Sequence, residues 1–205
     1  MRIKRIVKQS FRSIFNKIQR RKLLNKDFSL ISSNCVGACI LHDLGLRFNS
    51  PFVNLWMKPS DFLRFLDNMD YYLTCNMLFI EEPGIKYPIG VLDDIKIYFQ
   101  HYSSPDEALR KWEERSKRIN KENLFILFTD RDGCTYEDLR HFDSLPFTNK
   151  VVFTHIPYKE IRSSFYVKGW ENSESVGHCM NYVSNFSIKK HYDEFDYVSW
   201  FNGSM

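Results

Sequence analysis

The segment SSNCVGACILHD, residues 32–43, brings together side chains that suit chemistry on an anionic ligand. If Asn34 caps a helix that starts here, the backbone amides near Cys35 and Gly37 favour a phosphate, because a helix N-terminus carries partial positive charge. The same field lowers the pKa of a thiol and would make Cys35 a nucleophile. The alternative is structural: Asn34 only caps the helix, Gly37 permits close packing and Cys35 is a small buried apolar group.

The spacing C-x3-C-x2-H in this segment does not predict a metal site. Cys35, Cys39 and His42 can share one helix face, but a closed zinc or iron–sulfur site needs a fourth ligand. No second cysteine pair and no His-x3-His follows in the chain. We predict no metal, and the sequence names no cofactor. The substrate-binding residues predicted in this segment are Ser33, Asn34, Gly37 and His42.

Polar residues that end apolar runs are the other candidates, because ligands of α/β sheets bind beyond the carboxyl ends of the strands. Asp130 and Asp132 follow NLFILFT in a D-x-D spacing, which can hold a divalent cation against a sugar nucleotide or form a plain turn. His101 ends IKIYFQHY and His155 ends VVFTH, positions typical of catalytic bases, although a lone histidine at a strand end is more often a surface or satisfied residue. We predict Cys35, His101 and His155 as catalytic residues and Asp130 as a substrate contact, to a metal or a ribose.

Several enzyme classes lack their motifs in this chain. There is no GxGxxG, no GxxxxGK[ST] and no GxSxG, so dinucleotide enzymes, P-loop NTPases and serine hydrolases are not predicted. The basic helix expected over residues 105–119 carries Trp112 but also four acidic side chains, so nucleic acid is not a predicted partner.

Apolar runs and helical patterns alternate from residue 28 onward, which predicts an α/β fold. The expected architecture is a single three-layer domain, residues 27–205, with a mixed, largely parallel sheet. Residues 87–102 alternate in polarity and favour an antiparallel pair, and the periodicity after Ile156 is weak. The expected strands are 28–32, 52–57, 77–82, 87–94, 95–102, 123–130 and 151–155, and the expected helices are 35–45, 59–69, 105–119 and 136–145.

Residues 1–26 form a separate basic arm with ten basic side chains and no acidic one, whereas residues 27–205 carry 19 basic and 25 acidic side chains. The arm is predicted as an amphipathic helix, and two interpretations stay open: contact with an anionic membrane surface, or packing on its own domain or on a twin subunit. The apolar residues of its face are Ile3, Val7, Phe11, Ile14, Phe15 and Ile18.

The chain offers no apolar run of the roughly 18–20 residues needed to span a bilayer, and no signal peptide pattern. Its five scattered cysteines suit reduced thiols better than a disulfide framework. We therefore predict a cytoplasmic protein, with the basic arm as a candidate for peripheral contact with the inner membrane.

The chain from about Phe28 to Gly203 resembles a bacterial domain-of-unknown-function family labelled exopolysaccharide biosynthesis protein. The residues that carry the resemblance are ISSNCVGACILHDLGLRFNSPFVNLWM, KYPIGVLDDIKIYFQHYSS, RKWEERSKRIN with Asn123, and FDYVSWFNG. The resemblance implies an α/β fold and a link to surface or capsular polysaccharide. We expect either a transferase that acts on a sugar phosphate or nucleotide sugar, or a non-catalytic protein that docks on a membrane-associated polysaccharide assembly.

Overall fold

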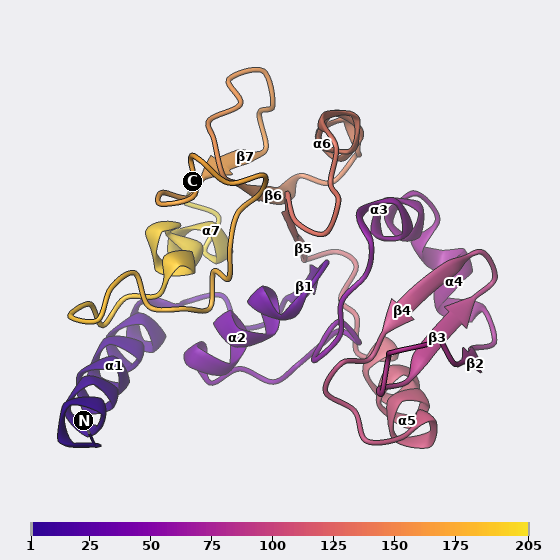
Figure 1. Ribbon diagram of the computed structural model, residues 1–205, viewed down its shortest axis with the longest axis horizontal. Helices are drawn as coiled ribbons and strands as arrows, with labels where there is room; N and C mark the ends of the chain where they lie inside the picture. Colours follow the sequence, from indigo (N-terminus) through magenta and orange to yellow (C-terminus); the bar gives the residue numbers. More distant parts are fainter. Residues whose placement is uncertain (1, 205) are drawn as a thin grey trace.

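The centre of the molecule is a parallel sheet in the strand order β1-β5-β6-β7 (Figure 1). The computed structural model describes residues 2–204, with side chains from Val7 onward. The four strands are short, and the one at residues 124–129 is a continuous apolar run that is buried throughout, as expected at the centre of a parallel sheet. They are β1 (Ser29–Ser32), β5 (Leu124–Thr129), β6 (Asn149–Thr154) and β7 (Ser164–Tyr166).

Helices cover both faces of this sheet. Successive side chains of the central strand β5 point to opposite sides and are all buried, so both faces of the sheet need a covering layer. On one face, the Phe128 ring lies 5.5 Å from that of Phe62 in α3 (Pro59–Asp67) and 5.2 Å from that of Phe142 in α6 (Tyr136–Ser144). On the other face, the Phe125 ring lies 5.1 Å from that of Phe201 in α7 (Tyr197–Phe201), and α2 (Cys35–Leu44) packs on the same side. The result is three layers.

A second, antiparallel sheet in the order β2-β3-β4 lies beside the first one (Figure 1). A turn at Asp93 and Asp94 joins β3 to β4, and Asp93 takes a left-handed φ of 54°. Trp112 of α5 lies in the hydrophobic core between the two sheets. The elements of this region are α4 (Met69–Thr74), β2 (Leu78–Ile80), β3 (Ile89–Leu92), β4 (Ile95–Tyr98) and α5 (Pro105–Ser116).

The first helix, α1 (Arg2–Lys22), packs against α2 and the short helix η1 (His191–Glu194) through a buried ionic cluster. Arg12 lies at its centre, with Nη2 2.6 Å from the Asp43 carboxylate and Nη1 bonded to Asp193. Lys190 Nζ lies 3.2 Å from Asp43, and the Tyr192 hydroxyl donates to the same carboxylate. The middle of α1 is thus fastened to the body by charge, while Leu23, just after the helix, is buried in the hydrophobic core.

The predicted α/β fold with a largely parallel sheet is confirmed, and the antiparallel strands form a sheet of their own. Asn34 and Gly45 cap α2 as expected, with a φ of 68° at Gly45. Ile3, assigned to the apolar face of the arm, lies outside the described side chains. Within residues 2–204, no helix combines the length and apolar character needed to span a lipid bilayer.

Candidate functional site

Asn34 ties the end of β1 to the end of the neighbouring strand β5. Its Oδ1 accepts from the Val36 amide at 3.1 Å, which caps α2, and its Nδ2 donates to Thr129 Oγ1 at 2.8 Å. The Gly37 amide lies 3.4 Å from Ser32 Oγ. Two of the amides expected to face an anion therefore already have partners. The Cys35 amide has no acceptor among the described residues, so it is a first-turn donor that an anion could use.

Gly37 is explained by packing. A Cβ at this position would lie 2.6 Å from the Cβ of Ser32, closer than real Cβ atoms approach one another, so α2 can lie this close to β1 only with glycine here. Ser33, just before α2, is buried, and its Oγ has no hydrogen-bond partner among the described residues. Buried hydroxyls are normally hydrogen-bonded, so this one is expected to bond to a water or to a ligand group.

Cys35 sits at the start of α2, but its environment does not favour a thiolate. Burial raises the pKa of its thiol to about 11, and the nearby Cys39 thiol adds to the rise. The Sγ atom lies 3.7 Å from the carbonyl oxygen of Leu55, to which the thiol donates. A protonated thiol with a backbone acceptor matches the packing interpretation, and the nucleophile interpretation stays a prediction that needs a base.

The buried Asp130 and the partly buried His155 form a pair at the ends of β5 and β6. His155 Nδ1 lies 2.6 Å from Asp130 Oδ2, and the His155 amide donates to the same oxygen at 2.8 Å. Because an ionised carboxylate only accepts, Nδ1 carries the hydrogen of this bond, and in the uncharged form of the ring Nε2 is the nitrogen with the lone pair. No described residue forms a hydrogen bond with Nε2. This geometry is that of a histidine held ready to accept a proton.

Asp130 itself is fully engaged. Its second oxygen, Oδ1, accepts from the Val176 amide at 2.7 Å, so both oxygens already have donors. Asp132 lies in an exposed turn with a left-handed φ of 60°. The D-x-D sequence therefore forms a turn, and the role that the geometry supports for Asp130 is to orient His155 rather than to bind a cation. Residues 2–204 contain no cluster of three or more His, Cys, Asp or Glu side chains arranged to hold a metal ion.

The other two predicted histidines form no hydrogen bond, ion pair or ring contact with this pair. The His101 amide donates to the Asn54 carbonyl at 3.3 Å, which places its turn beside the segment that contacts Ser33 and Cys35. His42 is highly exposed in the last turn of α2, at the opposite end of that helix from Asn34. The fold thus brings Ser33, Asn34, Asp130 and His155 to one edge of the sheet, and it separates His42 from them.

Residues 6–202 match the family described as Domain of unknown function (DUF1919). The chain belongs to this family. A Haemophilus influenzae protein described as "Uncharacterized protein" is 50% identical over 201 residues, which cover 98% of this chain and 97% of that protein. The resemblance to a family of unknown function is confirmed, while neither description mentions an exopolysaccharide.

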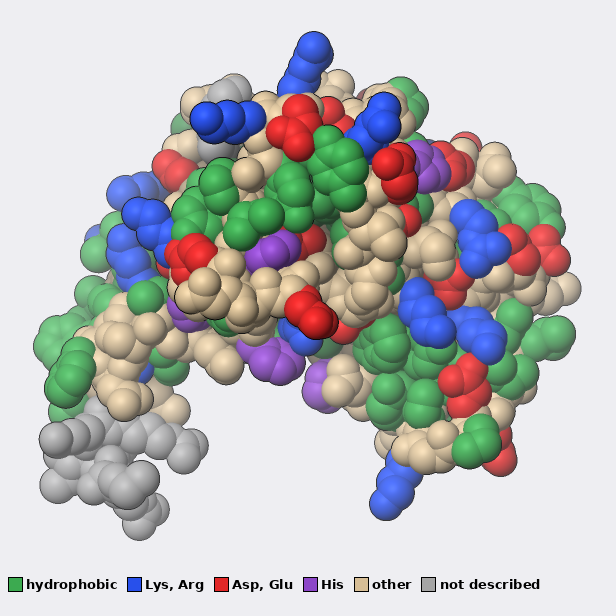
Figure 2. Space-filling view, turned by 45° about the horizontal axis from the view of Figure 1, so that its top comes forward, with side chains coloured by type: hydrophobic (Ala, Val, Ile, Leu, Met, Phe, Trp, Pro, Cys, Tyr) green, Lys and Arg blue, Asp and Glu red, His purple; other side chains and the backbone are tan. Residues whose placement is uncertain are grey.

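This DUF1919 chain also uses residues that the sequence did not single out. The Thr129 hydroxyl accepts a hydrogen bond from Asn34, and the Val176 amide donates one to Asp130. Arg131 Nη1 lies 3.2 Å from His178 Nδ1. Thr129 and Arg131 flank Asp130 in FTDRDG, so their positions were visible there. Val176 and His178 come from a stretch without periodicity, and nothing in the sequence marks it as reaching the strand ends. Histidine side chains gather near the middle of the face shown in Figure 2.

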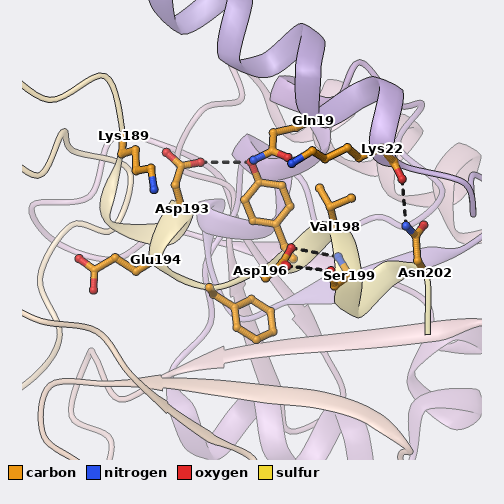
Figure 3. A pocket seen from close by; sticks show the side chains of 11 residues that line it. Gln19, Lys22, Lys189, Asp193, Glu194, Asp196, Val198, Ser199 and Asn202 are labelled. Carbon is orange, nitrogen blue, oxygen red and sulfur yellow. Dashed lines mark hydrogen bonds between the residues drawn. The ribbon is translucent and has the colours of Figure 1, made fainter. Parts of the chain in front are cut away.

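A hollow of this DUF1919 protein lies elsewhere, where α1 meets η1 and α7. Its volume is about 460 Å³, and its lining combines the acidic side chains of Asp193, Glu194 and Asp196 with the basic side chains of Lys22 and Lys189 (Figure 3). Some of the lining groups already bond within the protein: Asn202 Nδ2 donates to the Lys22 carbonyl at 3.0 Å, and the Ser199 hydroxyl donates to Asp196 at 2.7 Å. None of the predicted site residues lines this hollow.

Proposed function

We propose that the protein is a transferase of surface polysaccharide synthesis that moves a sugar or sugar-phosphate group from a phosphorylated donor onto a hydroxyl. The observation that carries the proposal is the Asp130–His155 pair at the carboxyl edge of the parallel sheet, with His155 Nδ1 fixed and Nε2 free. Ligands of α/β proteins bind at this edge. The link to polysaccharide comes from the sequence resemblance described above.

In the proposed reaction, His155 Nε2 takes the proton of the acceptor hydroxyl as its oxygen attacks the donor. The bond to the leaving phosphate breaks, and the phosphate keeps the bonding electrons. Asp130 holds the ring in place and stabilises the imidazolium that forms, as a buried carboxylate does for a catalytic histidine. Arg131 follows β5, and Ser33 and Cys35 follow β1, so the guanidinium, the Ser33 hydroxyl and the Cys35 amide are donors at this edge that suit the charge on the phosphate.

The proposed setting is the cytoplasmic face of the inner membrane, where lipid-linked sugars are built. Both the nucleotide-sugar donor and a membrane-bound acceptor would be within reach there.

Thermal unfolding against nucleotide sugars, sugar phosphates, Mg²⁺ and Mn²⁺ tests the proposal. A ligand at 100 times its dissociation constant stabilises a protein by about 2.7 kcal/mol, which is a visible shift in the midpoint. We expect one phosphorylated sugar to stabilise the wild type, and we expect His155→Gln to abolish turnover of that donor.

The matched control is His141→Gln. His141 Nε2 lies 3.0 Å from Asp67, so it is a second histidine–carboxylate pair, exposed on α6 and away from the strand ends. This variant should behave as wild type. The proposal is wrong if no phosphorylated sugar binds, or if His155→Gln turns the donor over at the wild-type rate.

A further inference from the structure

Four apolar side chains of α1 face solvent. Val7, Phe11, Ile14 and Ile18 are each between 46% and 55% exposed. Their spacing of four, three and four residues places them in one row along the helix. Figure 2 shows hydrophobic side chains gathered at the left-hand edge of the molecule, over α1. The apolar face of this amphipathic helix therefore points outward, the reverse of the usual arrangement in a globular protein.

The opposite face of α1 is locked to the body. Arg12 and Asn16 are buried there, about 150° around the helix from the exposed row. Lys8 Nζ donates to the Ser184 carbonyl at 3.0 Å, and Arg20 Nε donates to the Asp43 carbonyl at 2.8 Å. The apolar row cannot turn inward without breaking the ion pairs of Arg12, so its exposure is built into the fold.

The surroundings of the row are basic. Lys17, Arg21 and Lys22 are exposed, and residues 1–26 contain no acidic side chain. The loop that Lys8 contacts also carries Phe186, whose side chain is 94% exposed. Apolar side chains in a row with lysine and arginine beside them match the boundary between lipid headgroups and acyl chains.

A second copy of the chain fits this face poorly. Two such helices would bring Lys17, Arg21 and Lys22 of both copies together with no acidic side chain on either helix to pair with them. Four half-exposed side chains also supply far less surface than a stable interface, which buries about 800 Å² on each partner.

We propose that α1 lies flat on an anionic lipid surface, with the row of Val7, Phe11, Ile14 and Ile18 buried in it. This inference goes beyond the proposed function and does not depend on its chemistry.

Flotation of the full-length protein with vesicles tests the inference, using phosphatidylcholine alone and phosphatidylcholine mixed with phosphatidylglycerol. We expect flotation with the anionic vesicles only. Phe11→Ser with Ile14→Ser should raise the lipid concentration needed for half-binding by about tenfold or more, because the apolar contact is lost. Lys17→Glu with Arg21→Glu should do the same through charge, since each basic residue near the surface adds about 1 kcal/mol.

Two controls match these variants. Leu78→Ser removes an exposed apolar side chain from β2, and Lys86→Glu with Lys117→Glu makes the same charge change on the body. Both should bind vesicles as the wild type does. Circular dichroism would check that all variants are folded, which we expect since the changed side chains are exposed.

The inference is overturned if the wild type does not bind anionic vesicles, or if the α1 variants bind them as well as the controls do. Sedimentation showing a dimer that Phe11→Ser with Ile14→Ser dissociates would assign the face to a second copy instead.

Discussion

Two buried carboxylates, Asp43 and Asp130, are partnered in different ways. Asp43 is surrounded by Arg12, Lys190 and the Tyr192 hydroxyl, so its charge is balanced inside the protein. Within the part of the chain whose side chains are described, no Lys or Arg bonds to Asp130, which holds His155, and no residue there forms a hydrogen bond with the second ring nitrogen. The first arrangement fastens one element to another. The second leaves a reactive atom for a ligand, and this difference separates a structural charge cluster from a candidate site.

The largest expected effect comes from removing the cation of the structural cluster. Arg12→Met leaves Asp43 and Asp193 buried without their main partner, which should lower the free energy of unfolding by about 3–5 kcal/mol. Urea unfolding would measure it. The matched control is Lys17→Met on the exposed side of the same helix, with an expected change within about 0.5 kcal/mol. Equal effects from the two variants would show that Arg12 does not fasten α1.

The same cluster predicts an acid-sensitive component of stability. Burial alone would raise the pKa of Asp43, but hydrogen bonds from Arg12 and Tyr192 and the charge of Lys190 together lower it from 3.8 to about 2. Because the folded-state pKa is the lower one, the stabilisation is complete above about pH 4 and is lost as the pH falls towards about 2. Its size is about 2 kcal/mol. Unfolding of wild type and Asp43→Asn across this range should show a steeper acid loss in the wild type, and parallel curves would contradict the assignment.

Asp130→Asn should cost less stability than Arg12→Met but should remove function. The variant keeps one acceptor oxygen where the carboxylate used two, so a donor from His155 or Val176 loses its partner, at about 1–3 kcal/mol. Catalysis should fall sharply because the ring loses its fixed orientation. Asp67→Asn, which changes the exposed partner of His141, serves as the control and should alter stability by less than about 1 kcal/mol. Full activity in Asp130→Asn would show that the pair is only structural.

The smallest expected effect belongs to Cys35. Since burial keeps its thiol protonated, Cys35→Ser should change the free energy of unfolding by about 1 kcal/mol or less and should leave ligand binding and turnover intact. Assays of the purified variant would decide. Complete loss of turnover with unchanged stability would support Cys35 as the nucleophile. The site would then be centred on the start of α2 rather than on the end of β6.

The parts of this fold that follow from local rules could be predicted from the sequence. The apolar run before Asp130 forms β5, and Ser104 with Pro105 starts α5, with the Ser104 hydroxyl accepting from the Glu107 amide at 3.2 Å. Asn34 caps α2 by the same kind of local bond.

The remainder depends on contacts between distant parts of the chain. Arg12 looks like the other basic residues of the arm, and its role appears only when Asp43 and Asp193, 31 and 181 residues away, are placed beside it. The amide of Val176 reaches Asp130 from a segment without a periodic pattern. Polar residues at strand ends could be named as candidates from the sequence. That Asp130 pairs with His155 could not be predicted, because it depends on how β5 and β6 align side by side.

Nitrogen-15 NMR of histidine-labelled protein would test the central claim most directly, with His155→Gln assigning the signal. The account predicts a His155 ring with hydrogen on Nδ1 and a free Nε2, and a shift of the Nε2 signal when a nucleotide sugar or sugar phosphate is added, while His141 stays unchanged. A His155 ring with hydrogen on Nε2 instead, or an Nε2 signal that no phosphorylated sugar moves, would contradict it.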